Sequence, residues 1–192
     1  GGAVVFSSNS YERDYERARR LKWFGIDRET TKDENGEWKG QRWEIDIQEA
    51  GYKFNMNNID AAIGLANIKH LKWILEQHRK NAKIYDDAFS KTTQVVPIKR
   101  PKEADPSFWV YTVLCSDKKR DKLVQALNNV GINAGLVHVP NNDYACFASS
   151  NKKLPGLEKF SSMHFSLPCG WWLSQIDAGQ IADTVLEITE KL

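Results

Sequence analysis

The first part of the chain opens with a short apolar run and continues with a helical pattern. Ala3 to Phe6 is apolar and a polar cluster follows it, which predicts a buried strand that ends in a loop. After Ser10, apolar residues recur at helical spacing as far as Leu21, and Gly25 stands where a helix C-cap glycine belongs. Residues 27–42 are polar and rich in turn formers, so we expect them to lie outside the core.

From Ile59 the apolar period is helical for about 30 residues, much longer than the ~11 residues of an average helix. The positions that share this period are Ile59, Ile63, Ala66, Ile74, His78, Ala82, Tyr85 and Phe89. Such a length indicates a helix that joins two domains or lies at an interface. We expect a break or kink near Lys69 to Lys72.

After Ser90 the pattern changes to alternating strands and helices, which predicts a compact α+β domain. The predicted strands are 95–98, 108–114 and 132–139, with a helix from about 117 to Gly131. Residues 140–156 are expected to form a loop and 166–168 a short extended piece. A terminal helix follows, with Ser174 as its cap and Asp177 completing a capping box. The expected organisation is therefore 1–58, a connecting helix over 59–90, and a domain over 91–192.

Composition narrows the classes of function. The 27 basic and 25 acidic residues give a net charge of +2, which does not favour binding to nucleic acid. No apolar run approaches the ~18 residues of a membrane span, and no signal peptide is evident. The three cysteines lie far apart and show no metal-ligand spacing, which is typical of free thiols in a reducing compartment. We therefore expect a soluble, cytoplasmic, globular protein.

The run Gly51 to Leu65 places amides and small residues just before and within a predicted helix start. Helix N-termini favour phosphate, and here Lys53 adds a charge while Asn55 and Asn57 add amide donors. The plainer interpretation is that Asn57 or Asn58 caps the helix and that Lys53 is a solvated loop residue. On these residues alone the plainer interpretation is favoured.

A second group of polar residues follows His138, which ends a predicted strand and enters a polar loop. Together with Asp143 and Cys146, His138 is a candidate for a nucleophilic Cys–His–Asp triad. The members of such a triad meet in space, so their closeness along the chain is poor evidence for one. A zinc site is weaker still, because its four candidate ligands lack short regular spacing. Those candidates are His138, Cys146, His164 and Cys169.

Several motifs, in order, resemble the DegT/StrS-type nucleotide-sugar aminotransferases over nearly the whole chain. They are the Gly1-Gly2-Ala3-Val4-Val5 strand, Trp43 to Ile47, the Gly51 to Leu65 run, Asp105 to Trp109, Gly131-Ile132, Val137-His138, Leu154-Pro155-Gly156 and Ser166-Leu167-Pro168. The resemblance implies an α/β fold, namely the C-terminal half of a fold-type-I aminotransferase dependent on pyridoxal phosphate. Residues 1–58 would be the end of the cofactor domain, 59–90 the connecting helix and 91–192 the small α+β domain.

The resemblance also implies a reaction and a missing residue. Such enzymes move an amino group, usually from glutamate, onto a keto-sugar linked to a nucleotide, in polysaccharide, glycolipid or antibiotic synthesis. In the family, the lysine that binds the cofactor lies a few residues before the Gly-Gly pair, and the chain begins at Gly1 without a methionine. We therefore expect a truncated chain that is inactive by itself. The intact enzyme is expected to be a homodimer, and the exposed Ala3 to Phe6 surface is expected to promote self-association.

Residue roles follow from the resemblance only in part. In many members an asparagine reaches the neighbouring subunit's cofactor phosphate from the position that Lys53 occupies here, so Lys53 and Asn55 are the candidate cofactor-binding residues. His138 matches a histidine on the substrate side, and Asn142 lies where many members have a second histidine. Trp43 or Trp38 is expected to face the substrate. A non-catalytic binding module on the same scaffold is the alternative, and an unrelated cysteine hydrolase is a remote one.

Overall fold

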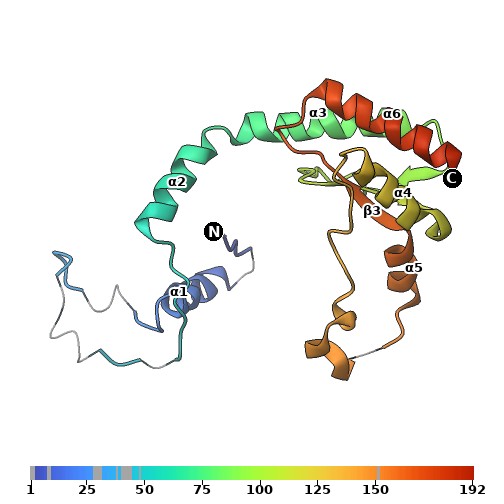
Figure 1. Ribbon diagram of the computed structural model, residues 1–192. Coiled ribbons are helices and arrows are strands. Elements are labelled where there is room, and N and C mark those ends of the chain that lie inside the picture. Colours follow the sequence, from blue (N-terminus) through green and yellow to red (C-terminus); the bar gives the residue numbers. More distant parts are fainter. Residues whose placement is uncertain are drawn as a thin grey trace. The chain divides into compact units, whose positions relative to one another are not determined.

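The computed structural model describes residues 3–7, 10–27, 32–37, 39, 45–47, 49–150 and 152–192 (Figure 1). It divides into two compact units, Gly1–Lys69 and His70–Leu192, which we describe separately. Within the described residues no helix has the length and apolar character that a bilayer crossing needs.

The first unit contains helices α1 (Tyr11–Leu21) and α2 (Asn58–Ile68). The N-cap predicted at Asn57 is confirmed, because its side chain accepts a hydrogen bond of 2.8 Å from the Asp60 backbone N–H. The strand predicted at Ala3 to Phe6 is wrong: these residues form no strand, and Val4 and Val5 are 76% and 86% exposed. An apolar run becomes a strand only where another strand can pair with it, and none of the described residues does so.

The second unit holds α3 (Leu71–Phe89), α4 (Asp117–Asn129), α5 (Pro155–Met163), α6 (Gln175–Lys191) and a three-stranded antiparallel sheet. The strands are β1 (Val95–Pro97), β2 (Tyr111–Cys115) and β3 (His164–Leu167), in the order β1-β2-β3. Short 3₁₀ turns η2 (Asn141–Asp143) and η3 (Ala145–Ser150) lie between α4 and α5. The helix predicted over 59–90 is thus two helices, and α2 and α3 are separated near Lys69, as the sequence predicts.

Helices α3 and α6 pack against each other, and their inward faces form much of the core (Figure 1). On α3 the buried positions recur at helical spacing: His78, Asn81, Ala82, Tyr85 and Phe89. On α6 they are Ala178, Ile181, Ala182, Val185 and Thr189. The predicted cap of α6 is confirmed, since the Ser174 hydroxyl accepts from the Asp177 backbone N–H at 3.1 Å.

The third strand lies elsewhere than the sequence predicts. Residues 132–139 contain only one isolated bridge, between Gly135 and Ser166, whereas β3 pairs with β2 along its whole length. All four residues of β3 are buried, so this strand lacks the alternation that marks a half-buried strand. The preceding α5 lies mostly beyond the predicted 140–156 loop and was not expected. Its first residue is Pro155, a favoured first position of a helix.

Candidate functional site

In the first unit, the segment that carries Lys53 and Asn55 is held against the end of α1 by backbone hydrogen bonds. Tyr52 N–H donates to the Leu21 carbonyl at 2.7 Å, and the Tyr52 carbonyl accepts from Phe24 N–H at 2.8 Å. Two further N–H groups, of Phe54 and Asn55, donate to the Lys22 carbonyl at 2.9 and 3.1 Å. This pairing fixes the backbone from which both candidate cofactor-binding side chains project.

Lys53 lies over aromatic rings. Its ammonium nitrogen is 3.6 Å from the centre of a Trp23 ring and 5.3 Å from that of Phe24, which is cation–π geometry. The side chain is exposed, so the charge keeps contact with solvent. Its predicted role at a cofactor phosphate stays a prediction.

Asn55 borders a cavity of about 290 Å³ at the end of α1. Its Oδ1 atom is buried and has no hydrogen-bond partner among the described residues. The other lining residues are Glu16, Arg19, Arg20, Lys22, Trp23, Ile26, Asp27 and Met56. Because a side-chain amide can present either its oxygen or its NH₂, this amide beside three basic residues fits a phosphate group.

In the second unit, His138 borders a cavity of about 420 Å³. Its ring meets that of Trp109 edge-on, with 6.0 Å between the ring centres. The residues that line this cavity are Ile98, Arg100, Pro106, Ser107, Phe108, Trp109, Val110, Tyr111, Thr112, His138, Phe160 and His164. We name it the His138 cavity. It combines aromatic rings with one arginine and two histidines, a set suited to a ligand with both ring and anionic groups.

A network of hydrogen bonds holds Arg100, one of the residues that line this cavity. Its Nη1 donates to Asp86 Oδ2 at 2.9 Å, and the Tyr111 hydroxyl donates to the same carboxylate. Burial acts to raise the pKa of Asp86, but the hydrogen bonds from Arg100 and Tyr111 and the Arg100 charge outweigh it, so this pKa is lowered. Burial, and then the bond to Asp86, raise the pKa of Tyr111, which therefore stays a neutral donor at neutral pH.

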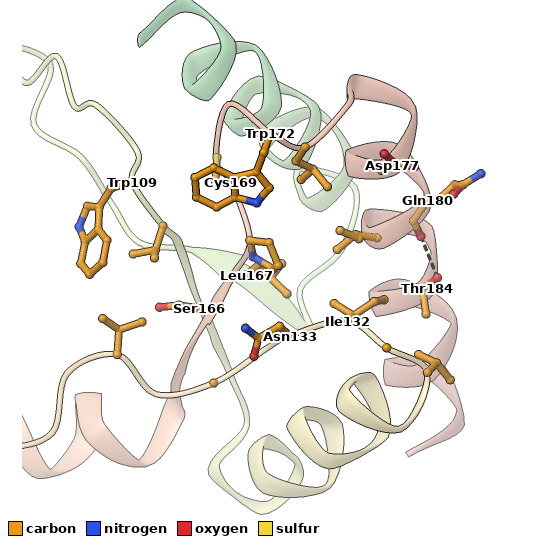
Figure 2. A pocket seen from close by; sticks show the side chains of 18 of the residues that line it. Trp109, Ile132, Asn133, Ser166, Leu167, Cys169, Trp172, Asp177, Gln180 and Thr184 are labelled. Atoms are coloured by element: carbon orange, nitrogen blue, oxygen red, sulfur yellow. Dashed lines mark hydrogen bonds between the residues drawn. The ribbon is translucent and has the colours of Figure 1, made fainter. Parts of the chain in front are cut away.

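A larger cavity of about 960 Å³ lies beside β3 and α6 (Figure 2). Figure 2 shows Trp109 and Ser166 on one side of it and Gln180 and Thr184 of α6 on the other. None of the described residues that line it is Lys, Arg or His, and its one charged member, Asp177, accepts a hydrogen bond from Ser174. Charge therefore favours the His138 cavity for an anionic ligand.

The remaining predicted substrate-binding residues are Asn142, Trp43 and Trp38. Asn142 lies in η2 and is not among the described residues that line the His138 cavity. Its Oδ1 atom is buried and has no hydrogen-bond partner among the described residues. Trp43 and Trp38 lie outside the described residues. Sequence reasoning missed Arg100 and His164 as lining residues, since neither stands in a motif.

The cysteine and zinc alternatives find no support in the described residues. Cys146 is exposed, and no hydrogen bond joins it to His138 or Asp143 among the described contacts. Burial raises the pKa of Cys169 to about 12, and its thiol donates to the His78 carbonyl at 3.4 Å. The described residues contain no group of three His, Cys, Asp or Glu side chains that could hold a metal ion.

The fold matches solved structures of sugar aminotransferases. The sugar aminotransferase CalS13 from Micromonospora echinospora superposes with a TM-score of 0.80 and 31% identity over 92% of this chain and 45% of that one. AtS13 from Actinomadura melliaura superposes with a TM-score of 0.80 and 34% identity, over 92% of this chain and 44% of that one. The chain therefore has a mixed α/β fold that corresponds to part of the fold-type-I aminotransferase architecture, as the sequence predicts.

The sequence also shows the family to which the chain belongs. The sequence profile of the DegT/DnrJ/EryC1/StrS aminotransferase family matches residues 1–186, and the chain belongs to this family. A UDP-4-amino-4,6-dideoxy-N-acetyl-beta-L-altrosamine transaminase from Campylobacter jejuni is 26% identical over 197 residues, covering 100% of this chain and 49% of the relative. The chain spans about half the length of the curated relatives that it matches.

Proposed function

We propose that this chain is part of an enzyme that transfers an amino group, from glutamate, to a keto-sugar linked to a nucleoside diphosphate. The family match over residues 1–186 carries this proposal. Two groups of relatives are named for transamination of UDP-linked amino sugars, one from Campylobacter jejuni and one, at 26% identity over 90% of this chain, from Shewanella sediminis. A polysaccharide or glycoconjugate pathway is the setting in which such a product is used.

The chain's own residues take two roles in this proposal. The His138 cavity holds part of the nucleotide-sugar, with Arg100 and His138 near its anionic groups and Trp109 against a ring. Lys53 and Asn55 would hold the phosphate of pyridoxal phosphate, and the bound cofactor would supply the electron sink for transamination. Asn142 and Trp43 are proposed to contact the sugar.

This chain alone is proposed to be inactive. A lysine that forms a Schiff base needs a desolvated site that lowers its pKa. None of the described lysines is buried, and Lys53 lies in contact with Trp23 and Phe24 at the surface. The residues present thus fit the phosphate end of the cofactor and do not fit its covalent attachment.

A homodimer is proposed for the intact enzyme. Helix α2 leaves large apolar side chains exposed, and these are Ile59, Ile63, Leu65 and Ile68, at 74%, 56%, 68% and 63%. A row of exposed apolar residues of this kind marks an interaction surface. We also propose a cytoplasmic location, because the cysteines are all free.

The proposal is tested with a longer polypeptide that includes the coding sequence upstream of Gly1. We expect a lysine shortly before the Gly-Gly pair, visible absorbance of protein-bound pyridoxal phosphate, and amino transfer from glutamate to a UDP-linked 4-keto-sugar. The chain from Gly1 serves as the matched control and should show neither absorbance nor turnover. A longer polypeptide that binds UDP but neither binds pyridoxal phosphate nor turns over would favour the binding module instead.

A further inference from the structure

Phe108 has a backbone conformation that residues with side chains rarely adopt. Its φ is +51°, in the left-handed region, and among the described residues Phe24 is the other non-glycine residue with a positive φ. A bulky residue in this region is strained, so the surrounding structure must hold it there. The next residue is Trp109, and the conformation of Phe108 therefore sets the direction in which the chain presents the Trp109 side chain.

Helix α3 supplies the group that holds the Phe108 main chain. The Nδ1 atom of His78 lies 3.0 Å from the Phe108 carbonyl oxygen. Because a carbonyl oxygen can only accept, His78 donates this hydrogen bond from Nδ1. The His78 residue is buried, with 8% of its surface exposed, and its Nε2 atom has no hydrogen-bond partner among the described residues. A neutral ring that carries its proton on Nδ1 thus places its single N–H on the partner that the fold provides.

The carbonyl and the ring of Phe108 are held by different residues. The carbonyl accepts no backbone hydrogen bond among the described contacts, so His78 is its described partner. The Phe108 ring lies under Arg100, whose guanidinium carbon is 4.8 Å from the ring centre. The residue after His78 on α3, Arg79, holds the same segment at an earlier point, where it donates to the Asp105 carboxylate at 2.7 Å. The His78 contact can therefore be removed while the other two remain.

Trp109 borders two cavities. It lines the His138 cavity, where its ring meets that of His138 edge-on with 6.0 Å between centres. It also lines the larger cavity of about 960 Å³, and Figure 2 shows its ring at one side of that cavity. Because Trp109 is 59% exposed, its direction depends more on the backbone that carries it than on packing around it.

We propose that His78 is a positioning residue for Trp109: its Nδ1–H holds the Phe108 carbonyl and keeps Phe108 in the left-handed conformation, so that the Trp109 ring borders both cavities. This contact needs one ring N–H, which the neutral imidazole provides. Its relevance to substrate rests on the proposed function, in which Trp109 lies against a ring of the nucleotide-sugar. The link from His78 to Trp109 is a property of the chain without ligand.

The first test uses nuclear magnetic resonance of the unsubstituted, ligand-free chain. Above about pH 8, where an ordinary histidine is neutral, we expect the ring-nitrogen signals of His78 to show the proton on Nδ1. The one-bond Cα–Hα coupling of Phe108, which distinguishes positive from negative φ, should show a positive φ. A nuclear Overhauser effect should join the Trp109 and His138 rings. A neutral His78 ring with its proton on Nε2 would overturn the proposal.

Variants at His78 then separate its hydrogen bond from its bulk. His78→Leu removes the donor and keeps an apolar side chain at this buried position, so we expect both the positive φ of Phe108 and the ring contact to be lost. His78→Asn can donate from nearly the position of Nδ1 and should retain both signals. Arg79→Leu is the matched control, because it removes the contact with Asp105 and should also retain both. Unchanged signals in folded His78→Leu, or their loss in folded His78→Asn, contradict the proposal.

Folding and substrate binding are measured separately. Retained core methyl signals of Val113 and Val185 show that a variant folds, and if His78→Leu does not fold, the native tautomer and His78→Asn decide. In the longer polypeptide that tests the proposed function, His78→Leu should raise KM for the UDP-linked keto-sugar with little change in kcat, since Trp109 would contact the ligand away from the reacting carbon. An unchanged KM contradicts the role in substrate binding. Absence of turnover in the unsubstituted longer polypeptide affects only the proposed function.

Discussion

The backbone nitrogen of Gly25 lies 2.0 Å from the point where a Cβ on residue 51 would stand. In the other direction, a Cβ on Gly25 would lie 2.0 Å from the Glu49 carbonyl oxygen, and Gly25 has φ +80°, which favours glycine. These two glycines let the segment before Tyr52 pass against the turn that follows α1. That close approach places Lys53 and Asn55 beside the end of the helix.

Gly51→Ala should therefore loosen this contact. The added methyl group meets main-chain atoms that cannot rotate away, so we expect a destabilisation of more than about 1 kcal/mol. Hydrogen exchange of the Tyr52 and Phe54 amides, which donate to Leu21 and Lys22, measures it as faster local opening. Gly64→Ala is the matched control: no atom lies within 4 Å of its added Cβ, and in α2 it should stabilise the helix by roughly 0.5–1 kcal/mol. Equal exchange in both variants would contradict the close packing.

The Asp86 carboxylate should contribute to the stability of the second unit. Asp86→Asn removes the charge that Arg100 and Tyr111 contact, and we expect a loss of about 1–2 kcal/mol, since the pair is partly exposed and therefore screened. Urea unfolding measures it. Asp87→Asn, which affects only the exposed pair with Lys83, should change stability little. If Asp87→Asn lost more stability than Asp86→Asn, the contacts of Asp86 with Arg100 and Tyr111 would not be a source of stability.

The same carboxylate predicts a pH dependence. The pKa of Asp86 is lower in the folded chain than the ordinary value of about 3.9. The ionised carboxylate therefore contributes its full stabilisation above that value, and this stabilisation is lost as pH falls through the folded pKa. The stability difference between the native chain and Asp86→Asn should therefore shrink between about pH 5 and about pH 2. Urea midpoints across this range measure it, and a difference that stays constant would mean that Asp86 is not the titrating partner.

Much of the fold could be predicted from periodicity and caps. The α3 and α6 faces repeat at helical spacing, and the caps at Asn57 and Ser174 have specific side-chain signals that the structure confirms. The third strand was predicted only in part, as an extended piece at 166–168. All four residues of β3 are buried, so the strand shows no alternation of polar and apolar residues that would have marked its full length. Residues 132–139 are apolar enough for a strand, but β2 pairs with β3 instead.

The residues of the candidate site could also be predicted only in part. His138 and the Gly51 to Leu65 run could be singled out because they belong to ordered family motifs. Arg100 and His164 could not, because each becomes a lining residue only through tertiary contacts: Arg100 is held by Asp86, 14 residues away, and His164 reaches the His138 carbonyl, 26 residues away. The sequence places these residues far apart and gives no periodic signal for either pairing.

The three cysteines should differ sharply in their rates of alkylation, because they differ in burial. Burial raises the pKa of Cys115 to about 11 and that of Cys169 to about 12, whereas Cys146 is exposed. Because the thiolate is the reactive form, iodoacetamide near pH 8 should modify Cys146 at least ~100-fold faster than the other two. Mass spectrometry of the digested chain measures each site, and Cys146→Ser should abolish the fast phase. Unfolding in urea should bring all three to similar rates. A buried cysteine that reacts first in the folded chain would contradict this prediction.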